Sequence, residues 1–96
     1  MSRLQALQHF VAVVEAGSFT AAADRLGVAK SAVSRRVRAL AQRLGAQLLN
    51  RTTRATDLTD SGRAFYERAV RVRADLDEAE AAVAQRGGRL IGTLRV

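Results

Sequence analysis

The stretch AAADRLGVAKSAVSRRVRAL, residues 21–40, constrains the fold of this chain more than any other part. Two runs with helical spacing of apolar residues flank Gly27, a residue suited to the left-handed turn that ends a helix. Only three residues separate the first run from Lys30, where the second run begins. The pattern therefore predicts a helix, a three-residue turn and a second helix.

Apolar spacings of three and four predict three helices in the first half, over about 4–16, 19–26 and 30–44, and a glycine follows each. Ser18 is a suitable N-cap for the second helix. The residues expected to face the core are Leu4, Leu7, Val11 and Val14, then Phe19, Ala22, Ala23 and Leu26, then Val33, Val37, Leu40 and Leu44. A chain of 96 residues has room for one small domain with a marginal core.

The outward face of the predicted third helix is basic. At about 100° per residue, the side opposite the apolar stripe carries Lys30, Ser31, Ser34, Arg35 and Arg38. The chain has 16 Lys+Arg against 9 Asp+Glu, a formal charge of +7, and residues 25–54 contain no acid. A DNA major groove admits one helix, and arginine can bond guanine through two hydrogen bonds. DNA is favoured, and an ordinary solvated basic face is the alternative.

The next segment, AQLLNRTTRATDLTDSG, has a different character. Leu48 and Leu49 precede a polar, threonine-rich tip, and residues 55–58 can return as a second short strand. We expect a small two-stranded β-hairpin, or wing, with Arg51 and Arg54 near its tip. An arginine there can enter a minor groove or hold a phosphate, and an exposed loop charge is the alternative.

A long helix is predicted from Thr59, a possible cap, to about Arg86. Its apolar residues repeat at spacings of 4, 3, 4, 3 and 4, as in a coiled coil: Phe65, Ala69, Val72, Leu76, Ala79 and Val83. A monomer of this size has little surface against which to bury such a seam, so we expect a dimer. Gly87 and Gly88 are expected to form a hinge.

Several functions lack positive support. The chain has no cysteine, and its one histidine, His9, lies among apolar residues with no carboxylate at ligand spacing, so a structural role is expected and no metal site. The serines have no recognisable base partner, so we expect no enzyme and no cofactor. No apolar run approaches the roughly 20 residues of a membrane span, and the start lacks the apolar core of a signal peptide. A cytoplasmic protein is expected.

These features together resemble the LysR-type transcriptional regulators, from FVAVVEAGSF at residues 10–19 to the TDSG at residues 59–62. The resemblance implies a mainly α winged helix-turn-helix over residues 1–58 and a linker and dimerisation helix over 59–86. Residues 87–96 would then be a hinge and the start of a missing effector-binding domain, because GTLRV looks like that domain's first strand. By the same resemblance, the chain is a fragment.

The resemblance also implies site residues. Lys30, Ser31, Ser34 and Arg35 stand at the family's groove-contacting positions, Arg54 stands at its wing arginine, and Ser18 and Thr20 match positions near the phosphate backbone. One departure is Ala29-Lys30-Ser31, where the family often has Ser-Gln-Pro. Ala29 removes a capping side chain, and Lys30 puts a point charge in place of an amide that can read adenine, so base preference does not carry over.

We therefore expect sequence-specific binding of double-stranded DNA by a homodimer, with a higher oligomer left open for the full-length protein. A small-molecule effector is expected only in the missing domain, and no membrane partner. Arginines crowd the first half of the linker helix and acids the second, so antiparallel pairing, crossing near Ala74, would join opposite charges. The rival hypotheses are a coiled-coil dimerisation module with an incidental basic face and a basic surface for acidic membranes.

Overall fold

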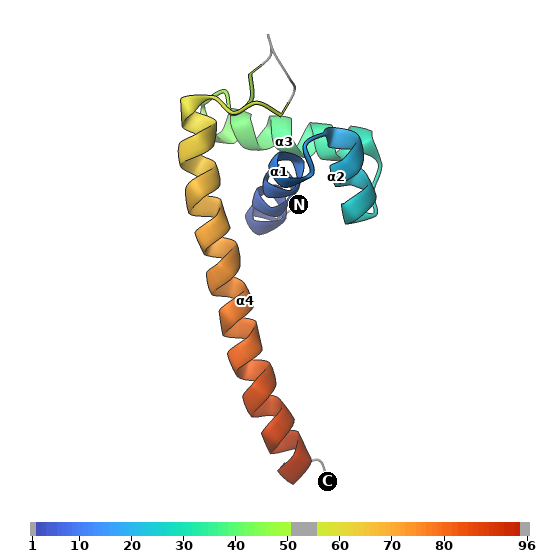
Figure 1. The fold of residues 1–96 in the computed structure, drawn as a ribbon, viewed down its shortest axis with the longest axis vertical. Helices are drawn as coiled ribbons and strands as arrows, with labels where there is room; N and C mark the ends of the chain where they lie inside the picture. Colours follow the sequence, from blue (N-terminus) through green and yellow to red (C-terminus); the bar gives the residue numbers. More distant parts are fainter. Residues whose placement is uncertain (1, 51–55, 95–96) are drawn as a thin grey trace.

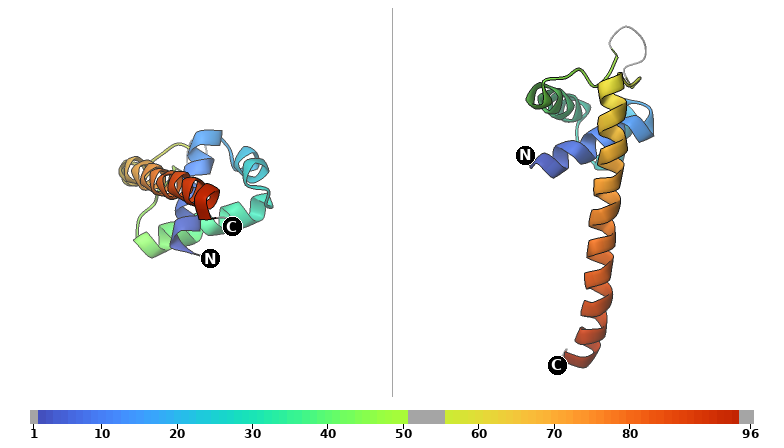
Figure 2. Two further views of the ribbon diagram at one scale, coloured as in Figure 1. Left: turned by 90° about the horizontal axis from the view of Figure 1, so that it is seen from below. Right: turned by 90° about the vertical axis from the view of Figure 1, so that its left-hand side faces the viewer.

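The computed structural model describes residues 2–50 and 56–94, the last eight of them as backbone only. It contains four helices: α1 (Arg3–Ala16), α2 (Phe19–Leu26), α3 (Lys30–Leu44) and α4 (Asp60–Leu94). The first three form a small head, and α4 starts beside it and extends far beyond it (Figures 1 and 2). All three predicted helices of the head are confirmed within one residue of their expected bounds.

Helix α1 is the centre of the head, because α2, α3 and α4 all pack against it. Its buried residues are Ala6, His9, Phe10, Val11 and Val13. The predicted stripe was therefore wrong except at Val11, and Leu4, Leu7 and Val14 are only partly buried. A single stripe does not describe a helix that is covered by neighbours on several sides.

The turn between α2 and α3 has the predicted length. Gly27 ends α2 in the left-handed conformation, at φ 69°, and the N–H of Val28 donates to the carbonyl of Ala23 at 3.1 Å. Such a pair of features closes a helix in the Schellman manner. Ala22 and Ala23 are buried, and their small side chains allow α1 and α3 to approach α2 closely.

The inner face of α3 is confirmed at Val33, Val37 and Leu40, which are buried against α1 and α2. Leu44 was predicted to join them and is 44% exposed. It is the last residue of α3, where the chain turns away at Gly45, so the cover over the stripe ends one turn before it.

His9 has a structural role, as expected. Its side chain is 7% exposed, with Nδ1 2.7 Å from the carbonyl oxygen of Gln5 and Nε2 2.7 Å from Nη1 of Arg36. A carbonyl can only accept and a guanidinium can only donate, so this geometry requires the neutral imidazole that is protonated at Nδ1. Arg36 is thereby directed into the head and away from the outward face of α3.

The wing is present at its base. Leu49 and Leu58 form one antiparallel bridge, and the N–H of Asn50 donates to the carbonyl of Asp57 at 2.7 Å. The described residues thus show a hairpin-like pairing and no extended strand, so the predicted two-stranded wing is seen only as this bridge. The tip, residues 51–55, lies outside the described residues.

Helix α4 begins as predicted and ends later. Thr59 caps it, because its Oγ1 accepts from the N–H of Gly62 at 2.9 Å. The helix then passes through Gly87 and Gly88 to Leu94, so the expected helix end at 86 was wrong, and residues 92–94 are helical and not part of a strand. A glycine inside a helix costs about 1 kcal/mol relative to alanine, which does not by itself stop a long helix.

The apolar seam of α4 divides into two parts. The rings of Phe65 and Phe10 lie edge to face with centroids 5.6 Å apart, and Ala69 is 1% exposed in the single chain. Further along, Val72 and Val83 are 45% and 69% exposed. The start of the seam therefore belongs to the head, and only the rest is free for another partner.

Candidate nucleic-acid interface

The outward face of α3 is exposed as the sequence predicts. Lys30, Ser31, Arg35 and Arg38 are exposed and Ser34 is half-buried. The first turns of α3 lie on the side of the head away from α4, and its last turn lies near the start of α4 (Figure 1). These five side chains therefore lie on one helix, and the first turns of α3, where Lys30 and Ser31 lie, are remote from α4.

The N-terminus of α3 differs from those of α1 and α2. The side chains of Ser2 and Ser18 cap α1 and α2 by accepting from the N–H groups of Gln5 and Ala21, each at 3.0 Å. Ala29 stands at the same position of α3 in an extended conformation and provides no side-chain cap. The first N–H groups of α3 consequently keep their capacity to bind an anion such as a phosphate.

Ser18 and Thr20 lie at the start of α2, and both are exposed. The Oγ of Ser18 already accepts one hydrogen bond as the cap of α2 and still has its own hydrogen to donate. A phosphate oxygen is a suitable acceptor for that hydrogen. The structure thus fits the implied position of Ser18 beside a phosphate backbone, with a second role in helix capping.

The base of the wing is fastened to the head on both sides. Oγ1 of Thr56 donates to the carbonyl of Gly17 at 3.3 Å, and Oγ1 of Thr59 donates to the carbonyl of Gln47 at 2.5 Å. Arg51 and Arg54 lie outside the described residues, so their place at the minor groove stays a prediction. The fastened base fixes where the wing leaves the head.

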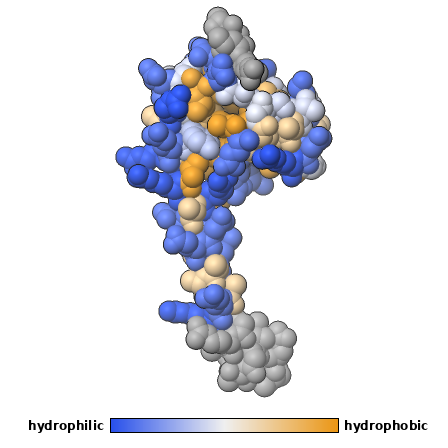
Figure 3. Space-filling model, in the orientation of Figure 1, coloured by the Kyte–Doolittle hydropathy of each residue, from blue (hydrophilic) through white to orange (hydrophobic). Residues whose placement is uncertain are grey.

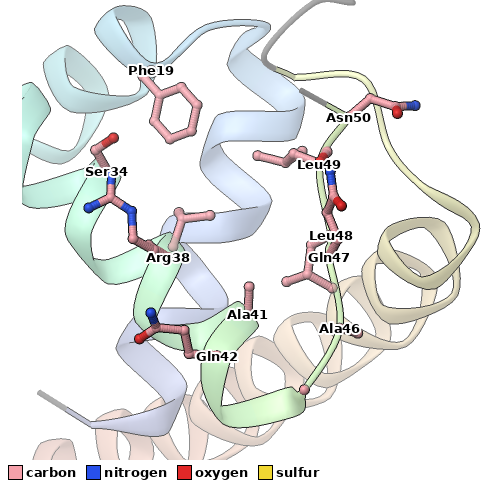
Figure 4. Close-up of a pocket in the computed structure, with 12 residues that line it drawn as sticks. Phe19, Ser34, Arg38, Ala41, Gln42, Ala46, Gln47, Leu48, Leu49 and Asn50 are labelled. Carbon is pink, nitrogen blue, oxygen red and sulfur yellow. Dashed lines mark hydrogen bonds between the residues drawn. The ribbon is translucent and has the colours of Figure 1, made fainter. Parts of the chain in front are cut away.

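A cavity of about 890 Å³ lies between α3 and the chain that follows it. Its lining residues, most of them labelled in Figure 4, are Phe19, Ser34, Val37, Arg38, Ala41, Gln42, Gly45, Ala46, Gln47, Leu48, Leu49 and Asn50. No acid is among them. Sequence reasoning missed Gln42, although it follows Arg35 by seven residues, which at 100° per residue places it within about 20° of Arg35 around the helix.

The free part of α4 has a split charge pattern. Arg63, Arg68 and Arg71 are exposed in its first half, and Asp75, Asp77, Glu78 and Glu80 are exposed in its second half. Arg73, another arginine of the first half, contacts Glu15 of its own α1, with Nη2 2.8 Å from Oε2. On the face drawn in Figure 3, α4 is largely hydrophilic beyond the head, with small hydrophobic patches.

Among residues 2–50 and 56–94, no three side chains of the His, Cys, Asp and Glu types are grouped to hold a metal ion. Within that same part of the chain, none of the helices has the length and apolar character needed to cross a membrane.

Two helices joined by a three-residue turn, with a basic and exposed second helix, define a helix-turn-helix domain of the DNA-binding kind. Residues 4–63 match the family described as bacterial regulatory helix-turn-helix protein, lysR family. The chain belongs to this family, which consists of transcription regulators and not of enzymes. The resemblance found in the sequence is thus confirmed.

The relatives agree with this assignment. An HTH-type transcriptional repressor of Pseudomonas aeruginosa is 50% identical over the whole chain, and the regulator CrgA of Neisseria meningitidis is 51% identical over 74% of it. The chain covers 30% and 24% of the lengths of these two proteins.

Solved structures give the same result. A complex of the BenM DBD with catB site 1 DNA is 37% identical, with a TM-score of 0.84 over 91% of this chain and 94% of that one. Full-length CbnR complexed with its target DNA is 36% identical, with a TM-score of 0.75 over 90% of this chain and 29% of that one. The fold is therefore that of LysR-type DNA-binding domains.

Proposed function

We propose that this chain binds specific double-stranded DNA sequences by placing α3 in the major groove. The observation that carries the proposal is the exposed face of α3 with Ser31 and Arg35, which lies within a stretch, residues 25–54, that contains no acid. Two comparison structures hold DNA bound to proteins of the same fold, which supports the same partner here. The rival hypothesis is a coiled-coil module with an incidental basic face. Such a module would not need the helix-turn-helix head.

The contacts divide by the chemistry of each side chain. Arg35 reads guanine through two hydrogen bonds, and Ser31 and Ser34 bond base edges or phosphates at short range. Lys30 supplies a point charge near the groove rather than a directional pair. Ser18 and Thr20 contact the phosphate backbone at the start of α2, and these contacts fix the position of the head without reading sequence.

The wing is assigned the neighbouring minor groove. Arg51 and Arg54 carry the charge of this segment, and a narrow minor groove has a negative potential that attracts arginine. Thr56, whose hydroxyl is bonded to the head, follows Arg54 by two residues in the sequence.

The active form is proposed to be a homodimer held by α4. The side chains assigned to the contact are Leu76, Ala79 and the exposed Val72 and Val83. Phe65 and Ala69 were expected to contribute, but Phe65 packs against Phe10 of the head and is partly buried, and Ala69 is buried in the single chain. Antiparallel pairing is favoured because it places the exposed arginines of one helix beside the acids of the other, and parallel pairing joins like charges.

The chain spans 30% of the length of its Pseudomonas aeruginosa relative, and the remaining proposals concern a protein of that length. The segment that follows α4 would lead to an effector-binding domain for a small molecule, and the dimer would act on the chromosome in the bacterial cytoplasm. Two heads at the ends of antiparallel helices would reach two successive major grooves, with a higher oligomer left open for the full-length protein.

The proposal is tested by selecting bound sites from random DNA and measuring affinity against unrelated competitor DNA. We expect the selected sites to contain two half-sites and to bind at least a thousandfold more tightly than competitor, as is usual for specific binders. Equal binding to every sequence, or none, would contradict the proposal.

A further inference from the structure

The cavity beside α3 is a preformed feature of the head. Its floor consists of apolar groups, including Val37 and Leu48, and the small residues Ala41 and Gly45 leave the space above this floor open. The opposite wall is tied to the chain that follows it, because the N–H of Thr59 donates to the carbonyl of Leu48 at 3.1 Å and the N–H of Asn50 donates to the carbonyl of Asp57 at 2.7 Å.

The polar groups of the cavity lie along one side of α3. Ser34, Arg38 and Gln42 follow each other at intervals of four residues, and their side chains project on the same side of α3 in Figure 4. At a rise of 1.5 Å per residue, Ser34 and Gln42 are about 12 Å apart along the axis, which is about the width of a major groove. A helix with Ser34 at the base edges therefore brings Gln42 to the rim of the groove, where a sugar–phosphate strand runs.

The lining suits such a strand better than a small anion. A small free anion with several charges would need several cations around it, and among the described residues that line the cavity Arg38 alone is charged. A nucleic-acid strand presents oxygen acceptors on one side and apolar deoxyribose on the other. The cavity offers hydrogen-bond donors on α3 and an apolar floor beside them.

We propose that this cavity seats one sugar–phosphate strand of the bound DNA, with Arg38 and Gln42 donating hydrogen bonds to its phosphates. The proposal rests on the DNA binding proposed above and adds Gln42 to the contact surface. Gln42 carries no charge and does not face a base edge, so it fixes the position of α3 in the groove without selecting a sequence.

The test adds a charge at this position. Each phosphate neutralised by a lysine steepens the dependence of log K on log salt by about 0.9. In the purified chain, Gln42→Lys should therefore steepen the salt slope by about 0.9 and raise affinity by up to about eightfold at 0.1 M salt. Specific and unrelated DNA should gain equally, because the contact is to phosphate. Gln42→Glu should weaken binding to both.

Gln85→Lys is the matched control. Gln85 is exposed on α4, 25 residues after the start of that helix at Asp60, and is not part of the face of α3 assigned to DNA, so the same change of charge should leave the salt slope unchanged. If Gln42→Lys also leaves the salt slope unchanged in a chain that binds DNA, this cavity does not hold a sugar–phosphate strand. That result would not affect the proposed DNA binding itself. A gain on only one sequence would mean that Gln42 faces a base and would also overturn the placement of a strand in the cavity. Failure of the unmodified chain to bind any DNA would overturn both proposals.

Discussion

The guanidinium of Arg73 on α4 holds both carboxylate oxygens of Glu15 on α1, with Nη1 2.9 Å from Oε1 and Nη2 2.8 Å from Oε2. The hydroxyl of Tyr66 lies 3.5 Å from Oε2 of the same carboxylate. This two-point contact comes one turn after the buried Ala69 and continues the attachment of α4 to the head. Together with the packing of Phe65 and Ala69, it fixes the direction in which the stem leaves the head.

The pair should make stability depend on pH. The hydrogen bonds from Arg73 are the main cause that lowers the pKa of Glu15 below its ordinary 4.5, and burial opposes them. A lowered pKa in the folded chain means that the stabilisation is present above the unfolded-state pKa and is lost as the pH falls through the folded-state pKa.

We therefore expect Glu15→Gln to reduce the free energy of unfolding at pH 7 by no more than about 1 kcal/mol, because both side chains are about one-third exposed to solvent. The difference from the unmodified chain should vanish in strongly acidic solution. Urea unfolding at fixed protein concentration measures it, with Glu67→Gln as the control on an exposed part of α4. A difference that is the same at pH 7 and pH 3 would count against the pair.

Two neighbouring arginines should behave in opposite ways. Arg35 is exposed on the outward face of α3, whereas Arg36 bonds the buried His9. Arg35→Ala should reduce the free-energy difference between specific and non-specific DNA binding by about 1–3 kcal/mol, with little effect on the free energy of unfolding. Arg36→Ala should lower the free energy of unfolding by about 1–3 kcal/mol, because Nε2 of His9 loses its donor. Equal losses on every DNA sequence would mean that Arg35 touches only phosphate.

The missing cap of α3 can be restored. Ala29 already has the extended backbone of an N-cap, at φ −70° and ψ 146°. Ala29→Ser should therefore add a hydrogen bond to the first turn of α3 and raise the free energy of unfolding by about 1 kcal/mol. Ala29→Gly, which adds no acceptor side chain, is the comparison that separates capping from backbone effects. A serine variant no more stable than the glycine variant would show that the serine side chain does not cap.

Position 62 requires glycine because its neighbours leave no room for a side chain, and not because of its backbone conformation. A Cβ at this position would overlap the carbonyl of Leu48 and stand 3.1 Å from Cδ2 of Leu58. Alanine ordinarily stabilises a helix by about 1 kcal/mol relative to glycine. Gly62→Ala should do the reverse and destabilise the chain by about 1–3 kcal/mol, as in other overpacked sites. Thermal unfolding tests this, and Ser61→Ala at the exposed neighbour should be close to neutral.

The direction of pairing can be measured with a spin label at Arg63, an exposed residue near the start of α4. Antiparallel helices that cross near Ala74 should hold the two labelled backbones about 33 Å apart, at 1.5 Å per residue. A parallel pair would keep them within about 15 Å, near helix-packing distance. The short distance in a dimer that still binds DNA would exclude the antiparallel arrangement.

The local parts of the fold could be predicted from the sequence because their causes are local. The glycines at 17, 27 and 45 fixed the ends of α1, α2 and α3, and the caps at Ser18 and Thr59 fixed the starts of α2 and α4. The outward basic face of α3 followed from helical geometry alone. The late end of α4 did not follow, because two glycines weaken a helix without stopping it.

The tertiary structure determined which side chains of one helix pack against or bond to another helix. The spacing of Phe65, Ala69 and Val72 is that of a continuous seam, and it cannot show that the seam is divided between the head and the free stem. The partners of Arg36 and Arg73 lie 27 and 58 residues away, so no local pattern specifies them. Local sequence sets helix geometry, and only packing between distant segments determines which face of each helix is buried.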